Sequence, residues 1–344
     1  MYSFENDYSE GACEEILAAL IKTNFKQEVG YGNDSYCLKA KELIKKTIED
    51  DNVDIHFVPG GTPCNILAIS LLKPYEAVIC VESGHINVHE TGAIEHGGHK
   101  ILTAPGYDGK ISAREVEEIC LKHTDEHMVK PRMVFISNST EFGTIYYKDE
   151  LEELSEVCHK YNLYLYLDGA RLGNALTAEG NDLTIQELTR LVDMYYIGGT
   201  KNGALLGEAM VIRNDELKEN FRYSLKQNGS MLAKARVVGI EFATFFENNL
   251  YFKLARHANK MAKSLKYVFT KNGIPMYMNS PTNQIFPVLP NNVLKKIEEK
   301  YRVTPWGAYD ENHTIVRFVC SWATREEAVI AFYEDYQKIV SDSI

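Results

Sequence analysis

The feature that most constrains this fold is a regular alternation, between about residues 50 and 213, of short apolar runs with segments of helical period. The runs are rich in β-branched and aromatic side chains, as buried strands are. Strands separated by helical segments are typical of a mostly parallel sheet with helices on its faces. We therefore predict an α/β fold around a mostly parallel seven-stranded sheet, with strands at 55–58, 77–81, 100–103, 133–137, 163–167, 194–197 and 208–212.

The sequence changes character after residue 214, where it becomes charged and rich in helical patterns. A long amphipathic helix is predicted at 251–270, ending before an Asn-Gly pair that suits a C-cap. Further strands are predicted at 275–278, 284–288 and 314–320, with helices at 292–301 and 325–340. Because a chain of 344 residues can bury two cores, we predict a large domain with the N-terminal segment at 1–245 and a small C-terminal α+β domain at 246–344.

Composition argues against several classes of partner. Lys and Arg number 37 against 48 Asp and Glu, a formal charge of −11, and no basic cluster with interleaved aromatic residues is present. Nucleic acid and anionic membranes are therefore not expected as partners. The sequence starts without a basic stretch followed by an apolar one, and no apolar segment approaches membrane-spanning length. The seven cysteines form no C-x-x-C pair, which favours buried thiols in a reducing cytoplasm and no structural metal.

Two predicted strands end in polar motifs with chemical potential. The run at 163–167 is followed by Asp168-Gly169-Ala170-Arg171, and the run at 194–197 leads into Gly198-Gly199-Thr200-Lys201. A carboxylate that keeps a ring nitrogen protonated and a lysine that forms an imine are what pyridoxal phosphate chemistry requires. Either residue alone is explained as well by a helix cap or a surface lysine. Together, at adjacent strand ends, Asp168 and Lys201 indicate a pyridoxal 5′-phosphate enzyme.

The strand at 55–58 leads through two glycines into a helix. In the sequence Pro59-Gly60-Gly61-Thr62-Pro63, Thr62 suits the N-cap and Pro63 the first helical position. Glycines let amides approach a ligand, and such a helix N-terminus binds phosphate. An ordinary strand-to-helix turn is the simpler explanation of this motif alone, but beside Asp168 and Lys201 the phosphate site is favoured. Neither a G-x-G-x-x-G nor a complete G-x-x-x-x-G-K-[ST] loop is present, which disfavours dinucleotide and P-loop enzymes.

Two histidines and two arginines are further candidates. His85 and His89 lie four residues apart after a predicted strand, so on a helix they share a face, and His85 is well placed to lie over a flat cofactor ring. Arg171 and Arg317 each suit a bidentate grip on an amino acid carboxylate. A structural role is the commoner explanation for any one of these residues alone.

With these residues assembled, the chain resembles the threonine aldolase and β-eliminating lyase family, which has the aspartate aminotransferase-like fold, pyridoxal phosphate fold type I. The resemblance spans nearly the whole length: Gly30-Tyr31-Gly32-Asn33-Asp34, 59–65, Ser83-Gly84-His85 with Glu90, 167–171, 199–203 and 317–322. It implies that Lys201 bonds covalently to the cofactor aldehyde, that Asp168 pairs with the ring nitrogen and that His85 stacks on the ring. It also implies that the phosphate is held by Gly60, Gly61, Thr62 and Thr200.

The resemblance further implies how substrate and subunits are arranged. Arg171 and Arg317 bind the substrate carboxylate, and Ser9 can meet it too. The family forms homo-oligomers, dimers or tetramers, whose active sites lie at subunit interfaces. Tyr31 and the basic stretch at 226–236 are then expected to reach a neighbour's cofactor.

The chain departs from the family pattern in three places. Gly60 stands where the family commonly has a serine, which removes one hydroxyl contact to the phosphate. The segment Ser137-Asn138-Ser139-Thr140-Glu141 lacks a histidine that many threonine aldolases carry there, and with Phe142-Gly143 it is closer to a branch that includes phenylserine aldolase. The opening Asp7-Tyr8-Ser9-Glu10-Gly11 also differs from the usual one.

The expected activity is reversible cleavage of an L-β-hydroxy-α-amino acid, such as threonine, allo-threonine or a phenylserine-like compound, to glycine and an aldehyde. His85, His89 or a phosphate-held water are alternatives for the base that takes the β-hydroxyl proton. Two other activities remain open, namely β-elimination or transamination with the same cofactor, and a binding role in a protein that has lost catalysis.

Overall fold

The computed structural model describes residues 1–341, and the seven strands expected between residues 50 and 213 form one sheet in the order β2-β8-β7-β6-β5-β3-β4. Strand β8 runs antiparallel to both of its neighbours, and the other pairs are parallel. The predicted α/β fold with a mostly parallel sheet is therefore confirmed. The bounds are β2 (Asp54–Val58), β3 (Glu76–Val81), β4 (Ile101–Ala104), β5 (Lys130–Ser137), β6 (Tyr164–Asp168), β7 (Met194–Gly198) and β8 (Glu208–Ile212).

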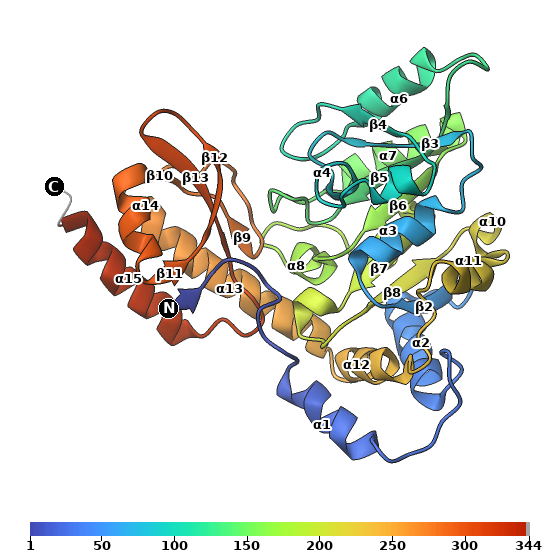
Figure 1. Cartoon of the computed structure of the whole chain (residues 1–344), viewed down its shortest axis with the longest axis horizontal. Coiled ribbons are helices and arrows are strands. Elements are labelled where there is room, and N and C mark those ends of the chain that lie inside the picture. The colour runs from blue at the N-terminus through green and yellow to red at the C-terminus, as the bar shows by residue number, and fades with distance from the viewer. Residues whose placement is uncertain (342–344) are drawn as a thin grey trace.

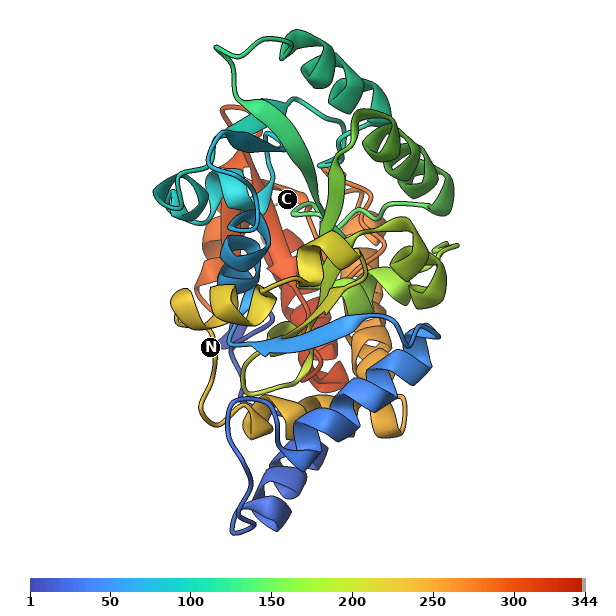
Figure 2. The same ribbon diagram turned by 90° about the vertical axis from the view of Figure 1, so that its right-hand side faces the viewer.

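Helices cover both faces of this sheet (Figure 2). Alternate strand residues enter two different cores, as the strand period of two requires: Ala77, Ile79 and Val81 of β3 face one, and Val78 and Cys80 the other. The first core is closed by α1 (Glu14–Thr23), α2 (Ser35–Ile48), α6 (Ala113–Lys122), α7 (Lys148–Tyr161), α9 (Ile185–Leu191) and α12 (Arg236–Glu247). The second is closed by α3 (Gly61–Ile69), α4 (His85–Val88), α5 (Ala93–His96), α10 (Asp215–Lys218) and α11 (Phe221–Gln227).

A second unit follows at the C-terminal side and is joined to the sheet by the long helix α13 (Leu250–Lys271) (Figure 1). Its core gathers aromatic side chains, among them Phe269, Phe318 and Phe332. The strands are β9 (Gln284–Ile285), β10 (Val288–Pro290), β12 (Thr304–Ala308) and β13 (His313–Val319), flanked by α14 (Asn291–Glu298) and α15 (Glu326–Ser341). The unit mixes helices with an antiparallel sheet, as the sequence predicts.

The structure differs from the predicted elements of this unit in three respects. The strand expected at 275–278 is only an isolated bridge between Met276 and Pro287. The strand expected at 284–288 is split into β9 and β10, because Pro287 between them has no N–H to donate to a ladder. The strand β12 was not predicted.

The N-terminal residues lie with the C-terminal unit. Strand β1 (Tyr2–Ser3) pairs in parallel with β11 (Tyr301–Arg302), and Phe4 is buried in the C-terminal core. The sequence had placed these residues with the large domain, and a pairing across 299 positions leaves no local pattern to predict it from. A division at residue 245 stays a prediction, and its last three residues, 342–344, lie outside the described part of the chain.

Three structural findings bear on partners and location. No helix within residues 1–341 combines the length and the apolar character needed to cross a membrane. Over the same residues, no group of three or more His, Cys, Asp and Glu side chains is arranged to hold a metal ion. All seven cysteines are free thiols, and only Cys120 is not fully buried.

Candidate active site

A cavity of about 270 Å³ brings together most of the residues singled out in the sequence. It lies where β2, β6 and β7 end, so that segments distant in sequence converge at one sheet edge. A larger hollow of about 690 Å³ beside α13 contains none of these residues. The predicted residues that line the smaller cavity are Gly60, Gly61, Thr62, His85, Asp168, Arg171, Thr200 and Lys201.

Asp168 is the last residue of β6 and is held by three donors. Its Oδ1 accepts from the Tyr196 hydroxyl at 2.5 Å and from the Ala170 amide at 3.0 Å, and its Oδ2 accepts from Asn65 Nδ2 at 3.1 Å. The side chain is 5% exposed. Because hydrogen bonds to a carboxylate are strong and directional, this carboxylate is fixed in one orientation at the floor of the cavity.

Lys201 lies in the short 3-10 helix η1 (Thr200–Asn202) that follows β7. Burial lowers the pKa of its amine, and the nearby positive charge of Arg171 lowers it further. Only the neutral amine is a nucleophile, so this environment prepares Lys201 to condense with an aldehyde. The ring of Tyr8, which the sequence analysis did not select, lies 6.0 Å from Lys201 Nζ.

A hydrogen-bonded series links His85 to Asp168. His85 Nδ1 lies 2.8 Å from Glu90 Oε1, and Asn65 Nδ2 donates both to that oxygen at 2.7 Å and to Asp168 Oδ2. Tyr166 fixes the amide by donating to Asn65 Oδ1 at 2.8 Å. Burial acts to lower the pKa of His85, but the bond to Glu90 and the charge of Asp168 outweigh it and raise that pKa. Glu90 and Asn65 lie in segments that carry the family resemblance, but only the structure shows that they connect His85 to Asp168 by hydrogen bonds.

The two histidines lie together, as their spacing predicts. His89 is the residue that ends α4, and its ring centroid is 5.6 Å from that of His85 and 6.1 Å from that of Trp306. Burial and the charge of His85 lower the pKa of His89. His85 lines the cavity, whereas His89 is exposed and does not line it.

The glycine-rich turn begins its helix earlier than the sequence predicts. Helix α3 starts at Gly61 with Gly60 as N-cap, so Thr62 is not the cap and Pro63 is the third helical residue instead of the first. The extended Gly60 makes the turn without a side-chain cap. A Cβ added to Gly61 would lie 3.0 Å from the Tyr196 hydroxyl. The turn therefore stays bare on the cavity side and presents the helix N-terminus, where an anion is stabilised.

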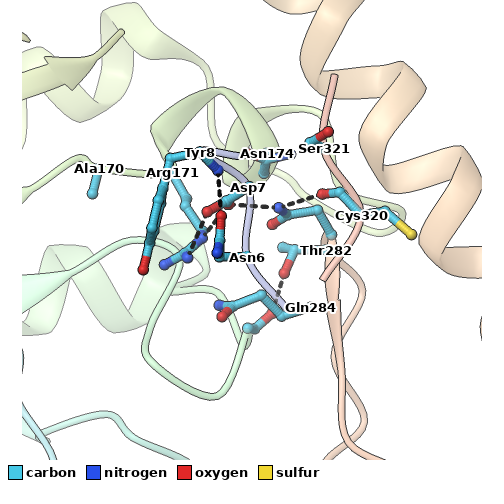
Figure 3. A network of polar contacts seen from close by, with 12 residues as sticks. Asn6, Asp7, Tyr8, Ala170, Arg171, Asn174, Thr282, Gln284, Cys320 and Ser321 are labelled. Carbon is cyan, nitrogen blue, oxygen red and sulfur yellow. Dashed lines mark hydrogen bonds and ion pairs between the residues drawn. The ribbon is translucent and has the colours of Figure 1, made fainter. Parts of the chain in front are cut away.

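The sequence analysis expects Arg171 to present a free guanidinium to the cavity, but part of this guanidinium is already bound within the chain. Its Nε and Nη2 donate to the two oxygens of Asp7 at 2.7 and 3.0 Å (Figure 3). Asp7 is fully buried and also accepts from Asn283 Nδ2 at 2.9 Å. Because a guanidinium carries five N–H groups, three of those on Arg171 remain for a ligand.

Arg317, on β13, does not line the cavity, and it forms no ion pair within residues 1–341. Its guanidinium lies 4.7 Å from the Trp306 ring, and its buried Nε has no hydrogen-bond partner within the same residues. Burial and the charge of Arg171 lower its pKa. A half-buried cation whose Nε lacks a partner is suited to an anionic ligand.

Ser9 and Tyr31 are not brought to the cavity within one chain. Ser9 is exposed and donates to Asn6 Oδ1 at 3.0 Å. Tyr31 is 46% exposed, and it contributes to a separate small cavity beside Arg222.

Two further acids line the cavity that the sequence analysis did not select as site residues. Glu141 Oε1 accepts from the His85 amide at 3.1 Å and from Ser137 Oγ at 2.9 Å, and burial raises the pKa of this carboxyl. Glu208 lies at the start of β8. In the sequence, Glu141 could have been noticed because it lies in the segment that departs from the family pattern. For Glu208, the only sequence signal was an acidic residue within an apolar strand run.

The donor set fits pyridoxal phosphate. Lys201 offers an amine of lowered pKa, Asp168 a fixed carboxylate for a ring nitrogen, and the bare turn before α3 a place for a phosphate. His85 is a planar group on the wall of the same cavity. These four functions are the protein's share of this cofactor chemistry.

Comparison with known proteins identifies close relatives. The family model described as beta-eliminating lyase matches residues 4–291. The low specificity L-threonine aldolase of a Pseudomonas species is 34% identical over 98% of each chain. A Leishmania major threonine aldolase structure superposes with a TM-score of 0.98 at 44% identity, covering 99% of this chain and 100% of that one. A putative L-allo-threonine aldolase of Listeria monocytogenes, 18% identical with a TM-score of 0.75 and coverage of 98% and 96%, shares the fold.

Proposed function

Because the chain belongs to the β-eliminating lyase family, we propose that it cleaves an L-β-hydroxy-α-amino acid such as threonine, allo-threonine or a phenylserine-like compound to glycine and an aldehyde. It is a pyridoxal phosphate-dependent aldehyde-lyase. The observation that carries this proposal is the convergence of Lys201 and Asp168, from the ends of two neighbouring strands, on one cavity. The names of its relatives support the choice of substrate class.

When bound, pyridoxal phosphate supplies an aldehyde that bonds to the substrate amine and a conjugated ring that accepts the electrons of the breaking Cα–Cβ bond. We assign Lys201 to the covalent attachment and Asp168 to the proton on the ring nitrogen. His85 lies against the ring. Gly60, Gly61, Thr62 and Thr200 hold the phosphate.

Arg317 and the three remaining N–H groups of Arg171 bind the substrate carboxylate. The charge of Arg171 acts on both Lys201 and Arg317, and the buried carboxylate Asp7 is paired with Arg171. By holding the carboxylate, these residues would orient the substrate and so select which bond to Cα is broken. Ser9 joins the site only if the N-terminal segment shifts. Tyr31 joins the site only if a neighbouring subunit contributes it.

We assign the removal of the β-hydroxyl proton to His89. Its lowered pKa keeps the imidazole neutral near pH 7, which a base requires. His85, whose pKa is raised by the bond to Glu90 although burial acts to lower it, is less suited to this role.

We also propose a cytoplasmic homo-oligomer, a dimer or tetramer with shared active sites, which acts on a small amino acid. Large apolar side chains stand exposed on and after α1, where Ile21 is 77%, Phe25 96% and Val29 62% exposed. Contact between subunits would cover them. Seven free thiols suit a reducing compartment.

The direct test is to identify the products. Purified protein with pyridoxal phosphate and L-threonine or L-phenylserine should release equal amounts of glycine and aldehyde, and Lys201→Ala should lose roughly 10³-fold or more of this activity because the covalent attachment is gone. The matched control is Lys295→Ala, an exposed lysine on α14 outside the cavity.

Pyruvate with ammonia, or a keto acid, would instead select the alternative activities, β-elimination or transamination. A wild-type protein that binds an amino acid but develops no absorption above about 400 nm with pyridoxal phosphate would select a binding role, since that band belongs to the bound cofactor.

A further inference from the structure

Glu208 occupies the point where the two cofactor-binding turns meet. It is the first residue of β8 and lies opposite Val58 of β2 and Gly198 of β7. Val58 directly precedes the glycine-rich turn, and Gly198 directly precedes the turn that carries Lys201. The Glu208 carboxylate therefore lines the cavity at the end assigned to the cofactor phosphate, where an acid is not expected.

The Glu208 carboxyl is buried and poised to change its charge. The residue is 4% exposed, and its Oε2 accepts from the Gly199 amide at 2.6 Å. Burial raises its pKa to about 7, although hydrogen bonds from Gly199 and Thr200 and the charge of Lys201 act in the opposite direction. Near neutral pH both forms of this carboxyl are accessible.

The surroundings of Glu208 contain little positive charge. The charge of Lys201 is the main positive charge that acts on it, and acids, phenols and a thiol also lie close to it. These are Glu241 of α12, Cys64 of α3, Tyr166 of β6, Tyr196 of β7 and Tyr251 of α13. A phosphate dianion added beside Glu208 disfavours its ionised form further, because like charges at close range repel.

We propose that Glu208 takes up a proton from solvent when the cofactor binds and, as a neutral carboxylic acid, donates a hydrogen bond to the cofactor phosphate. The carboxyl O–H then supplies the hydroxyl donor that Gly60 lacks in the glycine-rich turn. The proposal rests on the proposed function, because it presumes pyridoxal phosphate in this cavity. It makes Glu208 a cofactor ligand and cofactor affinity proton-linked.

Glu241, on α12, provides a matched control because it binds the loop that precedes Glu208. Its Oε1 accepts from the Leu205 amide at 2.9 Å, and burial raises its pKa to about 8. It thus resembles Glu208 in burial, charge and use of loop amides. It is not part of the cavity lining, so a phosphate there does not contact it.

The test is proton counting on the apoenzyme. Calorimetric titrations with pyridoxal 5′-phosphate and with pyridoxal, in two buffers of different ionisation enthalpy at pH 8, give the protons taken up by each ligand. The free phosphate is a dianion at this pH, since its second pKa is about 6. Wild type and Glu241→Gln should take up about one more proton with the phosphate ester than with pyridoxal, and Glu208→Gln should show no difference. Covalent attachment at Lys201 contributes equally to both ligands and cancels.

Two further measurements show which group carries the proton and how strongly cofactor affinity depends on it. The ³¹P resonance of the bound cofactor should stay at the dianion position across pH 6 to 9, because the carboxyl carries the proton. The dissociation constant of wild type relative to Glu208→Gln should rise by about tenfold for each pH unit above pH 7, as uptake of one proton requires.

The outcomes separate this inference from the proposed function. Equal proton uptake for the two ligands in wild type, or a ³¹P shift to the monoanion, overturns the role of Glu208 while leaving the cofactor in place. The wild-type protein alone can contradict the proposal, so the test remains decisive even if Glu208→Gln folds poorly. No binding of pyridoxal phosphate at all overturns both.

Discussion

The cofactor half and the substrate half of the proposed site are built in different ways. On the cofactor side, Asp168 and His85 have their polar atoms engaged by neighbours such as Tyr196 and Glu90. On the substrate side, Arg317 has a buried Nε without a partner among residues 1–341 and no ion pair there. The first half is pre-organised by these hydrogen bonds within the chain. The second half retains unsatisfied donors, and these are what an incoming carboxylate can satisfy.

The halves also differ in where their residues come from. The cofactor half stands on strand ends of one sheet, whereas the substrate half joins the N-terminal segment to β6 and to the C-terminal unit. Asp7 is the residue common to these three parts, through Arg171 and Asn283 (Figure 3). If the comparison holds, damage at Asp7 should loosen the substrate half while the cofactor half stays intact.

The largest expected effect is on stability, in Asp7→Asn. Removing one partner of a buried ion pair leaves Arg171 uncompensated, which costs about 3–5 kcal/mol. Thermal unfolding of the cofactor-loaded protein should shift down clearly, with the exposed Asp51→Asn as control. Unchanged melting would mean that the pair carries no net stability.

The same variant has a pH signature. Burial pulls the pKa of Asp7 upward, but the charges of Arg171 and Lys201 outweigh it and hold the pKa below the usual 3.8. The stabilisation is therefore complete above that value and is lost as the pH falls through the depressed pKa. Wild type should lose stability below about pH 4, and Asp7→Asn should lack this component of the acid transition.

The next effect concerns the base. With His89→Asn the retro-aldol rate should fall by about 10²-fold, the lower range for general base catalysis. Because the pKa of His89 is lowered, the wild-type pH–rate profile should have an acid limb below pH 6.5 that disappears in this variant and survives in His85→Asn. An acid limb that survives in both variants would exclude both histidines as the base and leave a water in that role.

Arg317→Ala should act mainly on substrate binding. Loss of a charge-assisted contact to the carboxylate costs about 2 kcal/mol, or roughly thirtyfold in KM, with a smaller change in kcat. Arg317→Lys should recover part of it. The diagnostic readout is the preference for threonine over its carboxamide, which the Ala variant should lose. A retained preference would assign the carboxylate to Arg171 alone.

How far the sequence could predict this site follows from the same contrast. Asp168 and Lys201 were found because apolar runs mark strand ends, and the ends of neighbouring strands in a parallel sheet must meet. Asp7 could not be found this way, since its partner Arg171 lies 164 positions along the chain. Asn65 and Glu90 sat inside recognised motifs, but a bond between them depends on how α3 packs against the segment after α4.

The predicted start of α3 was wrong, because local capping preferences did not decide where the helix begins. Thr62 has the better capping side chain, yet the helix begins two residues earlier than predicted, at Gly61 with Gly60 as its N-cap. A side-chain cap was not needed, because an extended glycine lets the strand turn directly into the helix. The substrate-side expectations for Ser9 and Tyr31 depend on rearrangement or on a second subunit, and neither follows from one chain's pattern.

The smallest effect sharpens the cofactor half. Gly60→Ser would place a hydroxyl in the phosphate turn, and the nearest atom to an added Cβ is Pro63 Cδ at 3.9 Å, so the side chain fits. The backbone there is extended, which serine adopts without strain. One added hydrogen bond is worth about 1 kcal/mol, so pyridoxal phosphate should bind apoenzyme roughly fivefold more tightly, as fluorescence titration can measure. Gly307→Ser, at an exposed position of β12 with open space around it, is the control. If Gly60→Ser left the affinity unchanged, the phosphate would have to lie elsewhere in the cavity, and the pre-organised half would need to be redrawn around Thr200.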